Sequence, residues 1–205
     1  MSRSYFSARV QRRVLAATAA AGAVALIVGV TAAGAATRPS PERSFSFNLV
    51  RSAAVVSCLP HAGGRVTITT GSLNDTMVVS LHGMPPNTGF DLFVIQQPNK
   101  PFGIAWYQSD VDAGRHGTGS ATVRGIFNSE TFSVSPGGTA TFPPTHQYHL
   151  GLWFTNPRTP FNLGCEPGAK TPVITPFNGE QHAGIQALNT ANFPVGRGPL
   201  SHVHG

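Results

Sequence analysis

Charged side chains are scarce in this sequence. Asp, Glu, Lys and Arg together make up 11% of its 205 residues, whereas soluble proteins average about 25%. Its eight acidic residues offer few partners for acid–base chemistry. The nucleophile elbow G-x-S-x-G, the zinc motif H-E-x-x-H and the phosphate-binding P-loop are all missing. We therefore expect a non-enzymatic protein, and a secreted hydrolase whose Ser, His and Asp are assembled by folding is the less favoured alternative.

Charge is also missing from one long stretch near the start of the chain. Residues 14–37 carry no charged side chain, and Arg3, Arg9, Arg12 and Arg13 precede them. The run ends in the small residues 33–36. A basic start, an apolar middle and a small-residue end are typical of an export signal. We expect residues 1–36 to be a signal peptide and the protein to be secreted and extracellular.

The same stretch has a second interpretation. Its 24 uncharged residues are long enough to cross a bilayer, so an uncleaved chain would touch the membrane through residues 14–37 and stay anchored there. Ala and Gly dominate the run, which favours cleavage. The Arg12-Arg13 pair raises export by the twin-arginine route as a further possibility.

A clustered basic surface is missing once the signal peptide is set aside. The formal net charge of +6 includes four arginines in residues 1–36; without them, 10 Lys and Arg face 8 Asp and Glu, a net charge of +2. The remaining cations are scattered along the sequence. Nucleic-acid binding needs clustered phosphate contacts, so we expect no nucleic-acid partner.

Cysteine is nearly absent, with two residues, Cys58 and Cys165. In an oxidising compartment an even pair indicates a disulfide. The pair would close a loop of 107 residues, which the chain-entropy model values at up to about 4.7 kcal/mol. The wide spacing lacks the tight C-x-x-C pattern of zinc sites.

Histidine, by contrast, is plentiful, with eight residues. The candidate metal ligands are His146, His149, His202 and His204, since borderline metals take imidazole. A secreted metal-binding protein is therefore another alternative function. No set of three ligands is evident, and we expect no cofactor.

The part of the chain after the signal is typical of an all-β protein. It has frequent turn residues, 23 Gly and 17 Pro in the whole sequence, and no long amphipathic helix between residues 44 and 176. Residues 37–43 form a proline-containing spacer, residues 44–175 a β-sandwich, and residues 176–205 a C-terminal extension packed on it. Within that extension, residues 181–189 could be a strand, a short helix or a covering loop.

Several strands follow from alternating apolar residues. Residues 66–70 and 77–81 predict a hairpin, and residues 104–108 and 121–127 predict another. Residues 90–95 are apolar on both faces except at Asp91, which indicates a strand that is covered on both sides.

The corner between two of these strands resembles a known family. Residues 81–94 (LHGMPPNTGFDLFV) are similar to the strand–corner–strand signature of fibronectin type III and related immunoglobulin-like sandwiches. Phe90 stands where that family usually has Tyr. The resemblance covers about 15 residues and implies an immunoglobulin-like antiparallel β-sandwich. It implies no catalytic residues.

One strand carries the best candidate for a binding surface. In residues 148–154, Leu150, Leu152 and Phe154 share one face, while His149, Gly151 and Trp153 share the other. An exposed Trp153 beside a bare glycine could stack on a sugar ring, and Trp106 and Tyr107 could extend the surface. The expected partner is a cell-surface glycan or another extracellular protein. We favour the alternative, in which the C-terminal segment covers this face and Phe193 or Leu188 packs onto Trp153, because apolar outer faces are usually covered.

Overall fold

The computed structural model describes residues 43–127, 146–176 and 182–203. The expected signal peptide, nearly all of the spacer and His204 lie outside these ranges. All described residues belong to one compact unit, Arg38–Gly205. Among them no helix is long and apolar enough to cross a membrane.

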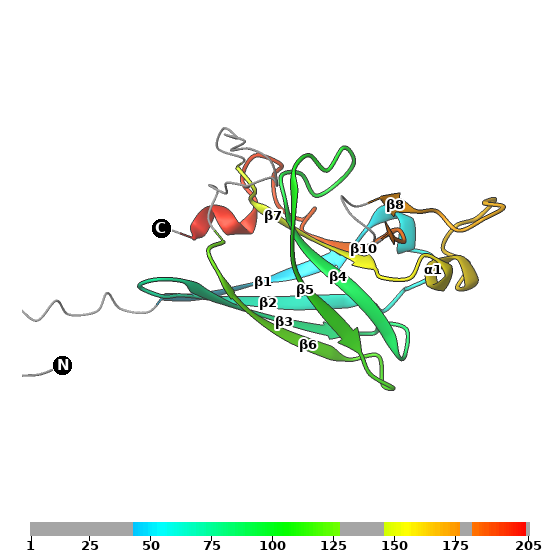
Figure 1. Cartoon of the computed structure of the whole chain (residues 1–205), viewed down its shortest axis with the longest axis horizontal. Helices are drawn as coiled ribbons and strands as arrows, with labels where there is room; N and C mark the ends of the chain where they lie inside the picture. The colour runs from blue at the N-terminus through cyan, green and yellow to red at the C-terminus, as the bar shows by residue number, and fades with distance from the viewer. Residues whose placement is uncertain (1–42, 128–145, 177–181, 204–205) are drawn as a thin grey trace, which may run out of the picture. The chain divides into compact units, whose positions relative to one another are not determined.

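The fold is all-β and is dominated by one antiparallel sheet (Figure 1). Its eight strands follow the order β5-β4-β7-β10-β1-β2-β3-β6. Their bounds are β1 Arg43–Arg51, β2 Gly63–Thr70, β3 Asp75–His82, β4 Thr88–Ile95, β5 Ala105–Ala113, β6 Gly119–Gly125, β7 His149–Phe154 and β10 Gln186–Asn189. The sheet is nearly closed, because its two end strands, β5 and β6, lie in contact with each other.

The remaining regular elements are short. A second sheet has two strands, β8 (Thr175–Pro176) and β9 (His182–Ala183). Helix α1 spans Arg158–Asn162, and two 3₁₀ helices span Ala53–Val55 (η1) and Pro199–His202 (η2). The described chain thus has almost no helix, as its turn-rich composition indicates.

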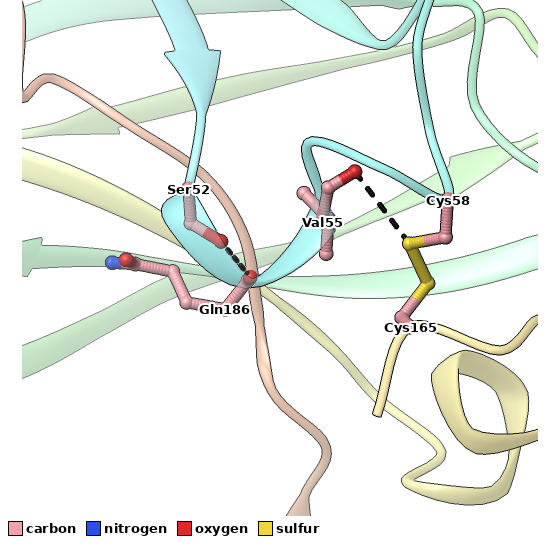
Figure 2. The surroundings of a disulfide bond; sticks show 5 residues. All are labelled: Ser52, Val55, Cys58, Cys165 and Gln186. Atoms are coloured by element: carbon pink, nitrogen blue, oxygen red, sulfur yellow. Dashed lines mark hydrogen bonds between the residues drawn. A yellow bond between two sulfur atoms is a disulfide. The ribbon is translucent and has the colours of Figure 1, made fainter. Parts of the chain in front are cut away.

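A narrow junction joins the two halves of the large sheet. β1 pairs along most of its length with β2, and then with β10 through Val50↔Asn189 and Arg51↔Leu188. Just beyond, the Ser52 amide donates to the Ala187 carbonyl at 2.9 Å, and the Ser52 hydroxyl donates to the Gln186 carbonyl (Figure 2). Ser52 therefore continues the bridge after the strand has ended.

The main core lies between the two halves. Alternate residues of β1, β2 and β3 face alternate residues of β4, β7 and β10 in one buried cluster. The rings of Phe90 and Phe154 lie 5.0 Å apart within it. This alternation is the period-2 pattern on which the strand predictions depended.

The predicted hairpin of residues 66–81 is confirmed. β2 and β3 pair with Val66 opposite Val79 and Ile68 opposite Met77. The second predicted hairpin is only partly right. β5 and β6 are consecutive and a tight turn joins them, but β5 pairs with β4 and β6 pairs with β3. Each of the two strands therefore pairs with a strand whose apolar face belongs to the core, β4 or β3, and cross-strand contacts there stabilise the pairing.

The prediction that residues 90–95 are covered on both faces is also confirmed. Phe90, Leu92 and Val94 lie in the main core, while Phe93 and Ile95 belong to a second buried cluster with Trp153 and Ala183. Phe102, from the loop that follows β4, packs against this second cluster.

Cys58 and Cys165 form the expected disulfide (Figure 2). Their Cα atoms lie 5.2 Å apart, within the range that a disulfide can bridge. Cys58 follows η1 and Cys165 follows α1. The bond therefore ties the segment between β1 and β2 to the segment after β7.

The corner of residues 81–94 depends on a glycine. Gly83 has φ +63°, and a Cβ at this position would collide with the carbonyl of His61. Only glycine tolerates both the left-handed backbone and this close approach. The corner also holds the β5–β6 turn, since the Met84 amide donates to Gly117 O at 3.0 Å and the Asn87 amide to Gly114 O at 3.2 Å.

Of the alternatives for residues 181–189, the strand is the one that forms. β9 occupies Ala183 and its neighbour, and β10 lies inside the large sheet between β7 and β1. Residues that follow position 176 therefore supply a central strand of the sheet.

Candidate functional site

Trp153 lies on the predicted face of β7 but is not open to a ligand. Only 3% of its surface is exposed. Phe93 and Phe102 pack edge-on against it, with ring centroids 5.5 and 5.0 Å away. Trp153 is therefore covered, as the sequence favoured, and the 96–104 loop places an aromatic ring where a sugar would otherwise lie. Phe102 covers it, in place of the Phe193 or Leu188 considered from the sequence.

His149 is buried as well, and neighbouring groups occupy both of its ring nitrogens. Nε2 lies 2.8 Å from the Val195 carbonyl, which can only accept, so Nε2 carries the proton. Nδ1 then accepts from the Thr190 hydroxyl at 2.8 Å. Burial lowers the pKa of His149, which favours this neutral form, while hydrogen bonds to backbone carbonyls act in the opposite sense. His149 is thus a structural residue and is not free to bind a metal.

The other predicted metal ligands do not converge with it. His146 is exposed and its Nδ1 lies 3.0 Å from the Tyr148 hydroxyl, whereas His202 packs against Phe45 at 6.1 Å. His204 lies outside the described residues. Within those residues, no three His, Cys, Asp or Glu side chains are placed to hold a metal ion.

Trp106 and Tyr107 are the two predicted ligand residues that remain exposed, by 39% and 48%. They are neighbours on the end strand β5, where consecutive side chains point to opposite faces. Tyr107 packs edge-on against Phe93 at 5.7 Å and donates a hydrogen bond to Asp110 at 2.8 Å. Burial and this hydrogen bond raise the pKa of Tyr107 to about 12. The four candidates therefore do not share one accessible surface.

The outer face of β4 and β5 holds a chain of hydrogen-bonded polar groups. Asp91 and Asp110 lie opposite each other in the ladder. The Thr155 hydroxyl donates to Asp91 at 2.7 Å, and the Tyr107 hydroxyl donates to Asp110. Burial raises the pKa of Asp91, the nearby Asp110 raises it further, and the Thr155 bond lowers it. With Asp91 only 3% exposed, this carboxyl group is a buried structural group.

A different surface holds the open site. On the outer face of β1, β2 and the end of β3 lies a depression of about 620 Å³. Its lining includes Asn48, Arg51, Val56, Gly63, Arg65 and His82. Small-molecule sites commonly have volumes of about 300–1,000 Å³. Every ionisable side chain that lines the depression is basic; among the described residues, no Asp or Glu contributes to it.

The register explains how these basic residues come together. Arg65 lies opposite Asn48 of β1 and opposite Ser80 of β3, and Gly63 lies opposite His82. Arg65 and His82 are thus diagonal neighbours on one face, about 7–8 Å apart at the backbone. Arg51 comes from the end of β1, where its Nη1 donates to the Pro60 carbonyl at 2.8 Å.

Sequence reasoning missed this site. Each of the three basic residues is unremarkable on its own, and the Pro and Gly of residues 60–64 indicate only a break between strands. In the structure Gly63 and Gly64 begin β2. A Gly pair that leads directly into a strand is the signal that could have been used, since strand glycines often mark a close approach of other groups.

The depression continues into a face rich in hydroxyl groups. Along β1 and β2, Ser46 Oγ lies 2.8 Å from Thr67 Oγ1, and Thr69 Oγ1 lies 3.4 Å from Ser44 Oγ. The exposed or half-buried polar residues of this face are Ser44, Ser46, Asn48, Thr67, Thr69, Thr76, Ser80, Ser120 and Thr122. Among the described residues, this face therefore offers many hydrogen-bonding groups beside Arg51, Arg65 and His82.

Comparison with known proteins adds no relative. No protein-family model matches the chain, and no curated protein matches it.

Proposed function

We propose that this chain is a secreted, non-enzymatic binding domain that acts at the cell surface after removal of residues 1–36. Two features support the proposal. The Cys58–Cys165 disulfide suits an oxidising compartment, and the signal-like residues 1–36 precede the folded unit. The ligand would be a component of the cell surface or another extracellular protein.

As part of this proposal, we assign the all-β fold to the immunoglobulin-like β-sandwiches. The two halves of the large sheet face each other across one core, as the layers of a sandwich do. The corner at residues 81–94 has the family's glycine at Gly83 with the required positive φ. Such sandwiches commonly act as binding modules, but fold alone does not give function.

One observation carries the binding role. The depression beside Arg51, Arg65 and His82 is open, large enough for part of a small ligand, and opens on a polar strand face. A site with several convergent polar groups is the default candidate for ligand binding in a protein of unknown activity.

Retention on a cell-envelope fraction tests this function. The full chain is expressed in a host that exports it, and the N-terminus of the exported form is sequenced. We expect it to begin near Thr37 and to sediment with envelopes prepared from exporting cells. A chain that stays in the soluble fraction at low and moderate salt would contradict the binding role. A chain that retains residues 1–36 would instead support the membrane anchor and leave the binding role standing.

A further inference from the structure

We infer that the depression formed by β1, β2 and the end of β3 binds an oxyanion, a carboxylate or a phosphate group, carried by an extracellular glycan. The glycan assignment rests on the proposed function, whereas the oxyanion assignment rests on the side chains of the depression.

Arg65 is the strongest support for an anionic ligand. Its side chain is exposed, and it makes no hydrogen bond or ion pair with any other described residue. A guanidinium group presents five N–H donors in a planar fork that matches carboxylate and phosphate oxygens in pairs. Arg65 lines the depression, and no described acidic side chain of the lining competes for its donors.

Arg51 adds a second guanidinium group that is already oriented. One of its nitrogens donates to the Pro60 carbonyl at 2.8 Å. That bond holds the side chain against the 56–62 segment and leaves its other N–H groups for a ligand. Less side-chain entropy is then lost on binding, which is how pre-organisation raises affinity.

Gly63 and His82 form the floor and one wall. A Cβ at Gly63 would lie 2.7 Å from His82 Nε2 and 2.8 Å from its Cε1. The imidazole therefore lies directly over bare backbone and places a ring nitrogen at the edge of the depression. No larger residue fits beneath it without moving the ring.

The surroundings favour a sugar rather than a bare ion. Val56 and Ala62 supply apolar contact, Asn48 supplies an amide, and the hydroxyl pair Ser46–Thr67 lies next along the strands. Sugars carry apolar ring faces and many hydroxyl groups, so both kinds of neighbour would be used. A volume of about 620 Å³ also exceeds what one phosphate or carboxylate group fills.

The test is an NMR titration of the mature chain with defined probes. Glucuronate supplies a carboxylate on a sugar, glucose 6-phosphate supplies a phosphate on a sugar, and glucose is the neutral match. We expect at least one charged sugar to shift the amide resonances of Gly63, Gly64 and Arg65, and glucose to leave them unchanged. The probe that binds more tightly identifies the group, because the two arms differ only in the anion.

Matched variants separate the site from general positive charge. Arg65→Gln and Arg51→Gln should each weaken binding of the charged sugar about 10- to 100-fold, the range for a lost charge-assisted hydrogen bond. Arg124→Gln removes the same charge from the same outer face, opposite Thr76 and away from the depression. It should change the affinity less than 2-fold by our estimate, since exposed distant charges are screened.

Gly63→Ala tests the geometry without changing any charge. The new methyl group displaces the His82 ring, which is the end of a movable side chain, so the fold should survive. We expect weaker binding with an unchanged pattern of amide resonances elsewhere in the sheet. Binding equal to that of the unchanged protein would remove Gly63 and His82 from the site.

Failure of this inference can be told from failure of the proposed function. If neither charged sugar shifts the three resonances, or Arg65→Gln binds as well as Arg124→Gln, the oxyanion site is overturned even when the chain sediments with envelopes. If the charged sugars bind but the chain does not sediment, the site stands and the cell-surface function falls. Tighter binding of polyglutamate than of either sugar would overturn the glycan and indicate an acidic protein partner.

Discussion

Asp91 shows how one buried carboxyl group shapes the outer face of β4. It lies opposite Asp110 and accepts from Thr155, and burial raises its pKa above the ordinary value near 3.8. The folded protein then binds this proton more tightly than the unfolded chain does. Its contribution is stabilising while Asp91 is protonated, at pH below about 3.8, and is lost as the pH rises through the raised pKa.

Asp91→Asn should therefore stabilise the protein at neutral pH. The amide oxygen can still accept from Thr155, its NH₂ can donate to Asp110, and no buried charge remains. We expect a gain above about 0.5 kcal/mol, the usual scatter of neutral substitutions. Urea unfolding from pH 4 to 7 measures it, and the gain should grow with pH. The exposed Asp112→Asn is the control; an equal gain there would show a general effect of charge.

Gly151 is a second residue where a small change has a defined result. A Cβ at this position would lie 2.6 Å from Cη2 of Trp153 and 2.8 Å from Nε2 of Gln186. Gly151→Ala should cost about 1–3 kcal/mol, since overpacking forces buried groups to move. Thermal and urea unfolding measure the loss. Gly196→Ala, where a Cβ meets nothing within 4 Å, should change stability by less than about 0.5 kcal/mol.

For single residues, the sequence predicted which face of a strand a side chain lies on better than it predicted whether that side chain is exposed. Alternation placed Trp153 on the face of β7 opposite to Leu150, Leu152 and Phe154, and the structure buries the two sets in different clusters. It could not show that Phe102, from a loop some 50 positions earlier, covers Trp153. A period-2 pattern shows which residues of a strand lie on the same face. It contains no information about whether a distant loop covers that face.

Among the elements, the junction of β1 with β10 is the narrowest part of the large sheet. It consists of two residue pairs and the hydrogen bonds of Ser52. Ser52→Ala leaves the buried Gln186 carbonyl without its hydroxyl donor. We expect a loss of about 1–2 kcal/mol and faster hydrogen exchange of amides in β10, measured by mass spectrometry.

The control for the junction is Ser46→Ala. Ser46 also bonds through its hydroxyl, to Thr67, but on an exposed face. Water can replace that partner, so its loss should stay below about 0.5 kcal/mol. An equal loss of stability at Ser52 and Ser46 would show that the Ser52 hydroxyl at the junction contributes no more than an exposed hydroxyl does.

Strands and their local pairing were largely predictable, and distant pairing was not. The β2–β3 hairpin follows from two alternating runs and a short turn. The pairing of Val50 with Asn189 joins residues from opposite ends of the folded unit. The sequence near Asn189 has no clear period, because the irregular register between Gln186 and Leu188 breaks the alternation. No local sequence pattern therefore predicted that β10 is a central strand of the sheet.

For the whole molecule, the disulfide is a covalent constraint on two distant segments of the chain. Cys58 and Cys165 are 107 positions apart. The double variant Cys58→Ser/Cys165→Ser should lose about 2–5 kcal/mol, the usual range for a native disulfide. Urea unfolding with and without reductant measures the loss, and reduction should leave the double variant unchanged. A double variant as stable as the oxidised protein would show that the bond constrains little.

The assembly of the basic depression is also a property of the whole molecule. The cations are scattered along the sequence, and the chain without residues 1–36 carries a net charge of only +2. Folding nevertheless brings Arg51, Arg65 and His82 to one depression, because β1, β2 and β3 are neighbours in register. Net charge is an average over the chain and cannot report such local concentration.

The position of Cys58 has a consequence for when the depression exists. Cys58 lies in the same segment as Val56 and Ala62, which line the depression, and as Pro60, which holds Arg51. A reduced chain carries the same arginines, but this wall is no longer tied to the segment after α1. Formation of the disulfide thus fixes this wall of the depression in the same step that closes the loop between Cys58 and Cys165. If the chain is exported and the depression binds an oxyanion, as proposed, a copy that has not yet reached an oxidising environment would lack the completed pocket, and export and the ability to bind would come together.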